Sequence, residues 1–142
     1  MEISLTGKWK GTIVYGNEYT MLKDKELYFE MELQLDGDKI FGTAKDTGGE
    51  GMNDTEATIK GIFINNRIDF IKRYEKIVLY EGNSRTHHEI ESHPAIYYSG
   101  VFDFTENSFS GTWEYKPGTF KLKSGEAYRN DSAKGSWTMK KN

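Results

Sequence analysis

The sequence predicts an all-β protein: a closed antiparallel up-and-down β-barrel of eight to ten strands that occupies residues 1–142 as one domain. Aromatic residues make up 14% of the chain, and 15 glycines stand against 2 prolines, a balance typical of twisted antiparallel sheets. Apolar and polar side chains alternate along most segments, and no segment shows helical periodicity. The first and last strand candidates share one pattern, so we expect them to pair and close the sheet.

Composition excludes several classes of function. The 142 residues suffice to bury one core without a metal or a disulfide. A formal charge of -3 predicts no nucleic acid and no anionic membrane as partner. There is no cysteine, which excludes disulfides and thiol catalysis. The N-terminus lacks a signal-peptide pattern and no apolar run is long enough to span a membrane, so we expect a cytoplasmic protein.

The first predicted strand runs from Gly7 to Tyr15. Trp9, Ile13 and Tyr15 alternate onto one face together with Gly11, and polar residues occupy the other face. A glycine between inward-facing aromatic residues indicates a strongly coiled strand.

The second predicted strand, Glu26 to Leu35, shows the clearest alternation in the chain. Its predicted inward side chains are Leu27, Phe29, Met31, Leu33 and Leu35. Residues 36–39 have the chemistry of a hairpin turn. The third predicted strand follows, with an inward face made of Ile40, Gly42, Ala44 and Asp46.

Residues 47–54 are rich in glycine and predict a loop. A phosphate-binding loop is the alternative, but the next segment predicts a strand and not the helix that such a motif needs. That strand runs from Thr55 to Ile64, and a turn at Asn65-Asn66 leads into a strand from Arg67 to Tyr74. We expect Ile77 to Gly82 to be its neighbour, and residues 82–94 to form a loop at the barrel rim.

The last third of the chain predicts a hairpin and a closing strand. The hairpin joins Tyr97–Thr105 to Phe109–Lys116, and a short strand is predicted at Thr119–Lys123. The predicted inward residues of the hairpin are Tyr98, Gly100, Phe102 and Phe104 in its first strand and Phe109, Gly111, Trp113 and Tyr115 in its second strand. The closing strand is Lys134 to Lys140. A Gly-x-Trp triplet recurs at Gly7/Trp9, Gly111/Trp113 and Gly135/Trp137.

Short motifs resemble known barrel families. Leu5-Thr6-Gly7-Lys8-Trp9 resembles the opening strand of avidins, and Gly-x-Trp in a first strand is also the lipocalin signature. A longer pattern is similar to Gly-x-Trp-x-Gly barrel domains of unknown function. It comprises Gly7–Gly11, Gly42–Gly49, Phe70–Tyr74, Tyr80–Gly82 and Gly111–Trp113. The resemblance implies a calycin-like fold and no particular activity.

The chain also departs from these families. In avidins the residue two beyond the first tryptophan is an asparagine that contacts biotin, whereas this chain has Gly11, so we do not expect biotin binding. The lipocalin Thr-Asp-Tyr motif is missing, and so is the helical lid of fatty-acid-binding proteins.

Lys72 is the most informative candidate for a site. Alternation places it on the inward face with Phe70 and Tyr74, where a charge needs a partner, and Asp46 is the candidate on the neighbouring inward face. Such a pair could orient a ligand or lower the lysine pKa for proton transfer. A purely structural ion pair is the alternative.

The three histidines lie in His87-His88-Glu89-Ile90-Glu91-Ser92-His93. In an extended chain His87, Glu89, Glu91 and His93 project to one side, which suits zinc or manganese. The alternative is a solvated rim segment without a metal, and this is the one we expect.

The inward aromatic residues either line a pocket or fill the barrel. The predicted ligand-binding residues are Trp9, Tyr15, Phe29, Asp46, Phe70, Lys72, Tyr74, Tyr80, Tyr98, Trp113, Tyr115 and Trp137. The expected function is non-catalytic binding of a small apolar or aromatic ligand at the open end, without a cofactor. The alternatives are a filled barrel that recognises a protein or peptide, and an isomerase or cyclase that uses Lys72 and a tyrosine. Self-association into a homo-oligomer stays open.

Overall fold

The computed structural model describes residues 4–16, 23–50, 53, 55–74, 76–81, 84–89, 95–116, 118–130 and 132–142. These residues contain twelve strands and no helix. The strands are β1 (Gly7–Tyr15), β2 (Glu26–Asp36), β3 (Lys39–Gly49), β4 (Ala57–Ile64), β5 (Arg67–Tyr74), β6 (Lys76–Glu81), β7 (Ser84–Glu89), β8 (Ile96–Asp103), β9 (Ser108–Tyr115), β10 (Gly118–Lys121), β11 (Ala127–Asn130) and β12 (Ala133–Lys141).

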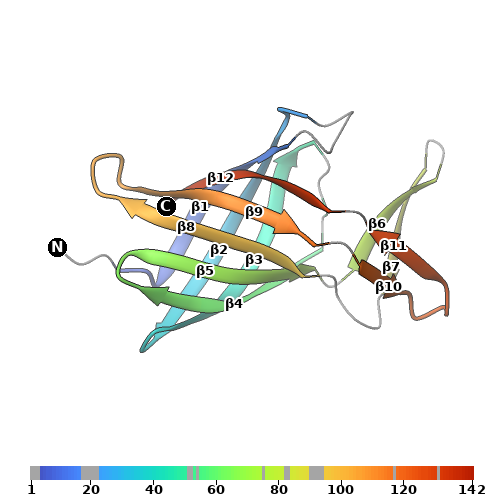
Figure 1. The fold of residues 1–142 in the computed structure, drawn as a ribbon, viewed down its shortest axis with the longest axis horizontal. Helices are drawn as coiled ribbons and strands as arrows, with labels where there is room; N and C mark the ends of the chain where they lie inside the picture. The colour runs from blue at the N-terminus through green and yellow to red at the C-terminus, as the bar shows by residue number, and fades with distance from the viewer. Residues whose placement is uncertain are drawn as a thin grey trace.

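Eight of these strands close into an antiparallel barrel (Figure 1). Their order around the barrel is β1-β12-β9-β8-β5-β4-β3-β2. The first and last strands pair from Trp9 opposite Lys141 to Tyr15 opposite Gly135, as the sequence predicts. Closure leaves none of these eight strands with an unpaired edge.

Two hairpins extend the chain beyond one end of the barrel, at the right of Figure 1. Along the chain, β6 and β7 follow β5 and precede β8, and they form one two-stranded sheet. β10 and β11, which follow β9 and precede β12, form the other. The predicted pairing of Ile77–Gly82 with the strand before it is therefore wrong, because β8 pairs with β5 at that position. Residues 84–89, predicted as loop, form β7.

The predicted faces of the barrel strands are confirmed except near strand ends. Leu27, Phe29, Met31 and Leu33 are buried, but Leu35 is 37% exposed because it precedes the turn at which β2 leaves the core. Phe104 is 44% exposed, since β8 ends at Asp103 and the residue falls in the turn. Strand β3 continues to Gly49, three residues into the predicted loop, across an irregularity in its pairing with β2 between Tyr28 and Phe29.

Aromatic side chains fill the barrel in layers. Near the turns that join β4 to β5 and β8 to β9, Trp9 packs on Phe109 with a ring distance of 5.3 Å. In the middle, Trp137 contacts Phe70 and Tyr98, both at 5.7 Å. Each tryptophan donates its indole N–H to a backbone carbonyl; the acceptors are Leu5 for Trp9, Val14 for Trp113, and Ser99 and Thr112 for Trp137. These rings are thus held as core residues.

Gly111 and Gly135, the glycines of the second and third Gly-x-Trp triplets, make room for the backbone of a neighbouring strand. A Cβ built on Gly111 would overlap the backbone oxygen of Ser99 in β8. The Trp137 ring packs directly against Gly100, which lies opposite Gly111. A Cβ on Gly100 would lie only 2.7 Å from that ring. Inward glycines therefore let the barrel coil tightly around its aromatic core.

We predict that Gly111→Ala lowers the free energy of unfolding by about 3 kcal/mol, because the added methyl group meets backbone and cannot be relieved by a rotamer change. Urea unfolding measures the loss. Gly48→Ala is the matched control, since its Cβ would meet only Tyr28 at 3.8 Å and should change stability by less than about 1 kcal/mol. Equal effects of the two substitutions would contradict this explanation.

Candidate functional site

The candidate site is built around Lys72, which β5 carries into the barrel. Its inward neighbours in the strand are Phe70 and Tyr74, and its side chain is 0% exposed. The predicted inward position is therefore confirmed. Among the lysines whose burial the structure describes, Lys72 is the one that is buried.

Asp46 of β3 is the charged partner of Lys72, as the sequence predicts. Lys72 Nζ lies 3.6 Å from Asp46 Oδ1, which is longer than a hydrogen bond. The carboxylate itself is well satisfied, because the Tyr74 hydroxyl donates to it at 2.9 Å and the Asn53 backbone N–H donates at 2.9 Å. Among the described residues, no acceptor lies within hydrogen-bond distance of Nζ.

Three aromatic rings surround the ammonium group. Nζ lies 4.7 Å from the ring centre of Tyr74, 5.6 Å from that of Phe29 and 5.7 Å from that of Tyr98. These distances permit cation–π attraction, which partly replaces the hydration that burial removes. The cage therefore combines one carboxylate with three ring faces.

The electrostatics of the site follow from burial and from Asp46. Burial lowers the pKa of Lys72, and the charge of Asp46 opposes that shift. Burial also raises the pKa of Tyr74 well above its usual 10.0, and the neighbouring Asp46 charge adds to the shift. Tyr74 thus keeps its proton at neutral pH and acts as a hydrogen-bond donor.

The site lies toward the end of the barrel from which the two hairpins extend. Tyr115 and Tyr74, near the ends of β9 and β5, are only partly buried. Tyr15, also at this end, is 8% exposed and donates its hydroxyl hydrogen to the Glu50 carbonyl at 2.9 Å. A tyrosine-rich layer therefore separates Lys72 from the end of the barrel.

The structure brings only part of the predicted set together. Phe29, Asp46, Lys72, Tyr74 and Tyr98 form the site described above. Phe70 stacks on Tyr98 with ring centres 4.7 Å apart, and Tyr15 contacts Trp113 edge to face at 6.0 Å. Tyr115 lies in the partly buried layer, Trp137 in the middle of the core and Trp9 in the layer near the turns. The side chain of Tyr80 lies outside the described residues.

Sequence reasoning missed Asn53. Its backbone N–H donates to Asp46, and its side-chain oxygen accepts from the Thr55 backbone N–H at 3.0 Å and from the Thr55 hydroxyl at 2.7 Å. An Asn-x-Thr sequence with this turn geometry is a local signal for the bend. The contact with Asp46 has no sequence signal, because any non-proline residue can supply a backbone N–H.

The histidine segment leaves its metal-binding alternative untested. The side chains of His87 and Glu89, and all of Glu91 and His93, lie outside the described residues. Across the part of the chain that is described, no group of three or more His, Asp or Glu residues is arranged to hold a metal ion. Nor does the described part contain a helix with the length and apolarity needed to cross a membrane.

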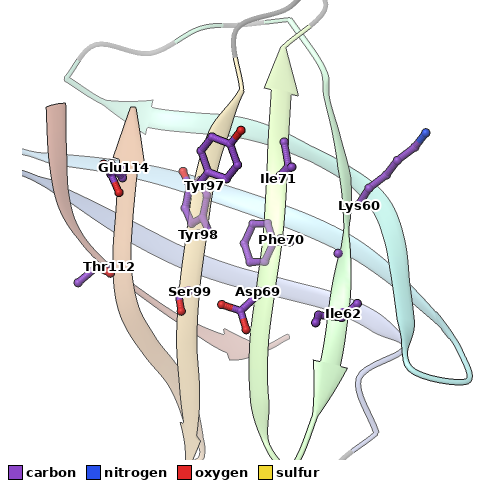
Figure 2. A pocket seen from close by; sticks show the side chains of 11 residues that line it. Lys60, Ile62, Asp69, Phe70, Ile71, Tyr97, Tyr98, Ser99, Thr112 and Glu114 are labelled. Atoms are coloured by element: carbon purple, nitrogen blue, oxygen red, sulfur yellow. The ribbon is translucent and has the colours of Figure 1, made fainter. Parts of the chain in front are cut away.

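A second candidate surface lies on the outer wall of the barrel. An open depression of about 330 Å³ lies across β4, β5, β8 and β9, and Figure 2 shows the side chains that line it. Ile62, Ile71 and Tyr97 give it an apolar floor, with Lys60 and Glu114 among its polar residues. Phe70 and Tyr98 belong to the same strands but are buried in the core.

We predict that the stability of the wild type relative to Lys72→Met increases as pH rises toward the usual lysine pKa of 10.5. Between the lowered folded-state pKa of Lys72 and its usual 10.5, the unfolded chain holds a proton that the folded chain lacks. The free energy of unfolding therefore rises with pH in this window, by at most about 1.4 kcal/mol per unit, and the gain disappears as pH falls. Urea unfolding in matched buffers measures it.

Two features keep this measurement specific. Tyr74 makes the free energy of unfolding fall as pH rises, because its folded-state pKa is raised. This opposite effect begins only above the usual tyrosine pKa of 10.0. Lys60→Met, at an exposed position of β4, provides the control and should show no such dependence on pH. A difference between wild type and Lys72→Met that stays constant over this range would refute the assignment.

We predict that Tyr74→Phe costs about 1–2 kcal/mol of stability, since Asp46 loses a donor while the ring keeps its place over Lys72. Thermal and urea unfolding measure the cost. Tyr97→Phe removes a hydroxyl from a residue that is 38% exposed, and should change stability by no more than about 0.5 kcal/mol. Similar losses in the two variants would show that the hydroxyl of Tyr74 has no special role.

Comparisons of the chain with models of protein families, with curated proteins and with solved structures give no match. The eight-stranded antiparallel barrel is consistent with the calycin-like fold that the short motifs imply.

Proposed function

We propose that this protein binds a small, neutral, apolar or aromatic molecule at the hairpin-bearing end of its barrel, with Lys72 as the polar anchor and without catalysis. One observation carries the proposal: the buried ammonium of Lys72 has no hydrogen-bond acceptor among the described residues. Buried polar groups are normally satisfied, and an unsatisfied one calls for a specific explanation, such as a functional role.

The charge balance of the site favours a neutral ligand. Lys72 and Asp46 together carry no net charge, and Tyr74 keeps its proton. A bound carboxylate would add a second buried negative charge beside Asp46, at a cost of several kcal/mol. A carbonyl, ether or hydroxyl oxygen could instead accept a hydrogen bond from Nζ without changing the charge.

The surroundings favour an apolar or flat molecule. Phe29, Tyr74 and Tyr98 present ring surfaces around Nζ. Ligand sites commonly combine such apolar walls with a few polar groups that fix orientation. The partly buried Tyr74 and Tyr115 mark the side from which a ligand would enter. We also propose that the barrel is calycin-like and that the protein is cytoplasmic, as the sequence leads us to expect.

A protein or peptide interaction is the second candidate function, and the outer-wall depression favours it. Its apolar residues include Ile62 and Tyr97, which are 46% and 38% exposed. Large exposed apolar side chains gathered on one face are typical of interaction surfaces. This candidate needs no ligand in the barrel, so the two functions separate cleanly by experiment.

We predict that uncharged aromatic carbonyl compounds in a small-molecule thermal-shift screen stabilise the wild-type protein. At about 100 times the dissociation constant, the gain is about 2.7 kcal/mol. Lys72→Met should keep its own folding transition yet lose this ligand-induced gain, because the hydrogen-bond donor is gone.

The matched control is Lys60→Met, which removes a lysine from the outer-wall depression and should keep the full ligand response. Ligand stabilisation retained in Lys72→Met would place binding elsewhere. Recovery of the bound compound in altered form would point to the isomerase or cyclase alternative.

A further inference from the structure

We infer that Lys72 captures an aldehyde or ketone covalently, as a protonated Schiff base with the Asp46 carboxylate as its counter-ion. The inference rests on the proposed function and names the ligand class of the same site. It starts from a primary amine enclosed in an apolar cage next to an acid and a hydroxyl donor.

The cage supplies the conditions that Schiff-base formation needs. An amine attacks a carbonyl only in its neutral form, and desolvation in an apolar pocket favours that form. Lys72 is 0% exposed and lies among the rings of Phe29, Tyr74 and Tyr98. Burial lowers its pKa accordingly. The other lysines whose burial is described are exposed to solvent and lack such a cage.

Asp46 is placed to move the protons of the reaction. Its Oδ1 lies 3.6 Å from Nζ and accepts a proton from the ammonium, which leaves a neutral amine and a carboxylic acid. The amine nitrogen then forms a bond to the carbonyl carbon, and one N–H proton moves to the oxygen to give a carbinolamine. Asp46 returns its proton to that hydroxyl, the C–O bond breaks, and water leaves.

The balance of atoms and charges in this reaction suits the site. Ammonium and carbonyl compound become iminium and water, with no oxidant, reductant or additional reactant. One positive charge opposite Asp46 is present before and after, so the product introduces no new buried charge. The Tyr74 hydroxyl, 2.9 Å from both Asp46 oxygens, holds the carboxylate in place throughout.

Reductive trapping tests the inference on the wild-type chain of 142 residues. Cinnamaldehyde is the probe, and cyanoborohydride reduces any iminium to a stable secondary amine. Intact mass should show one adduct per chain, and peptide mapping should place it on Lys72. Lys72→Arg should lose this adduct, whereas Lys60→Arg should keep it. Asp46→Asn should slow trapping by about 100-fold, as expected for loss of a general acid–base group. Adducts spread over the exposed lysines, with Lys72 unmodified, would overturn the inference.

Cinnamyl alcohol separates this inference from the function on which it rests, because it has the same ring and chain but no carbonyl group. If both compounds stabilise the wild type and Lys72 stays unmodified, the Schiff base is refuted and non-covalent binding stands. If neither compound stabilises or labels the protein, both are refuted for this chemical class. Labelling of Lys72 by the aldehyde, together with unlabelled stabilisation by the alcohol, supports both.

Discussion

Burial of one ammonium group inside a closed sheet is the constraint on which the interior depends. An isolated charge there would cost several kcal/mol, so the barrel supplies a carboxylate, a phenol and three ring faces at one level. These groups come from β2, β3, β5 and β8, and closure of the sheet brings them together. Asp46 also accepts a hydrogen bond from the backbone N–H of Asn53, so the charged pair is connected to a residue that follows β3.

The two ends of the barrel differ in the side chains that fill them. Toward the turns that join β4 to β5 and β8 to β9, the interior is filled by rings such as Trp9 and Phe109, and the Trp9 N–H donates to the Leu5 carbonyl. Eight strands leave an interior that such side chains can fill. Toward the hairpins, Tyr15 and Tyr74 lie in the interior layer, and their hydroxyl groups donate to polar partners. The buried charged and hydroxyl groups described above are therefore concentrated toward one end of the barrel.

The interior site and the outer depression are opposite faces of the same strands. On β5, Lys72 and Phe70 point inward while Ile71 lies between them on the outer wall; on β8, Tyr98 points inward and Tyr97 outward. A substitution that distorts either strand would disturb both surfaces. Changes that keep the backbone, such as Tyr74→Phe and Tyr97→Phe, are accordingly the ones that assign an effect to one face.

The sequence by itself determined which face each barrel residue occupies, because a period of two needs no knowledge of the neighbours. The inward Lys72 and its partner Asp46 follow from that period and from the cost of a buried charge. Closure between β1 and β12 follows from the pattern that the first and last strands share. Only the tertiary structure decided that β6 pairs with β7, that Leu35 and Phe104 leave the core, and that the Asn53 backbone reaches Asp46. Alternation specifies a face but neither the neighbouring strand nor the residue at which a strand leaves the core, since both depend on how the whole sheet closes.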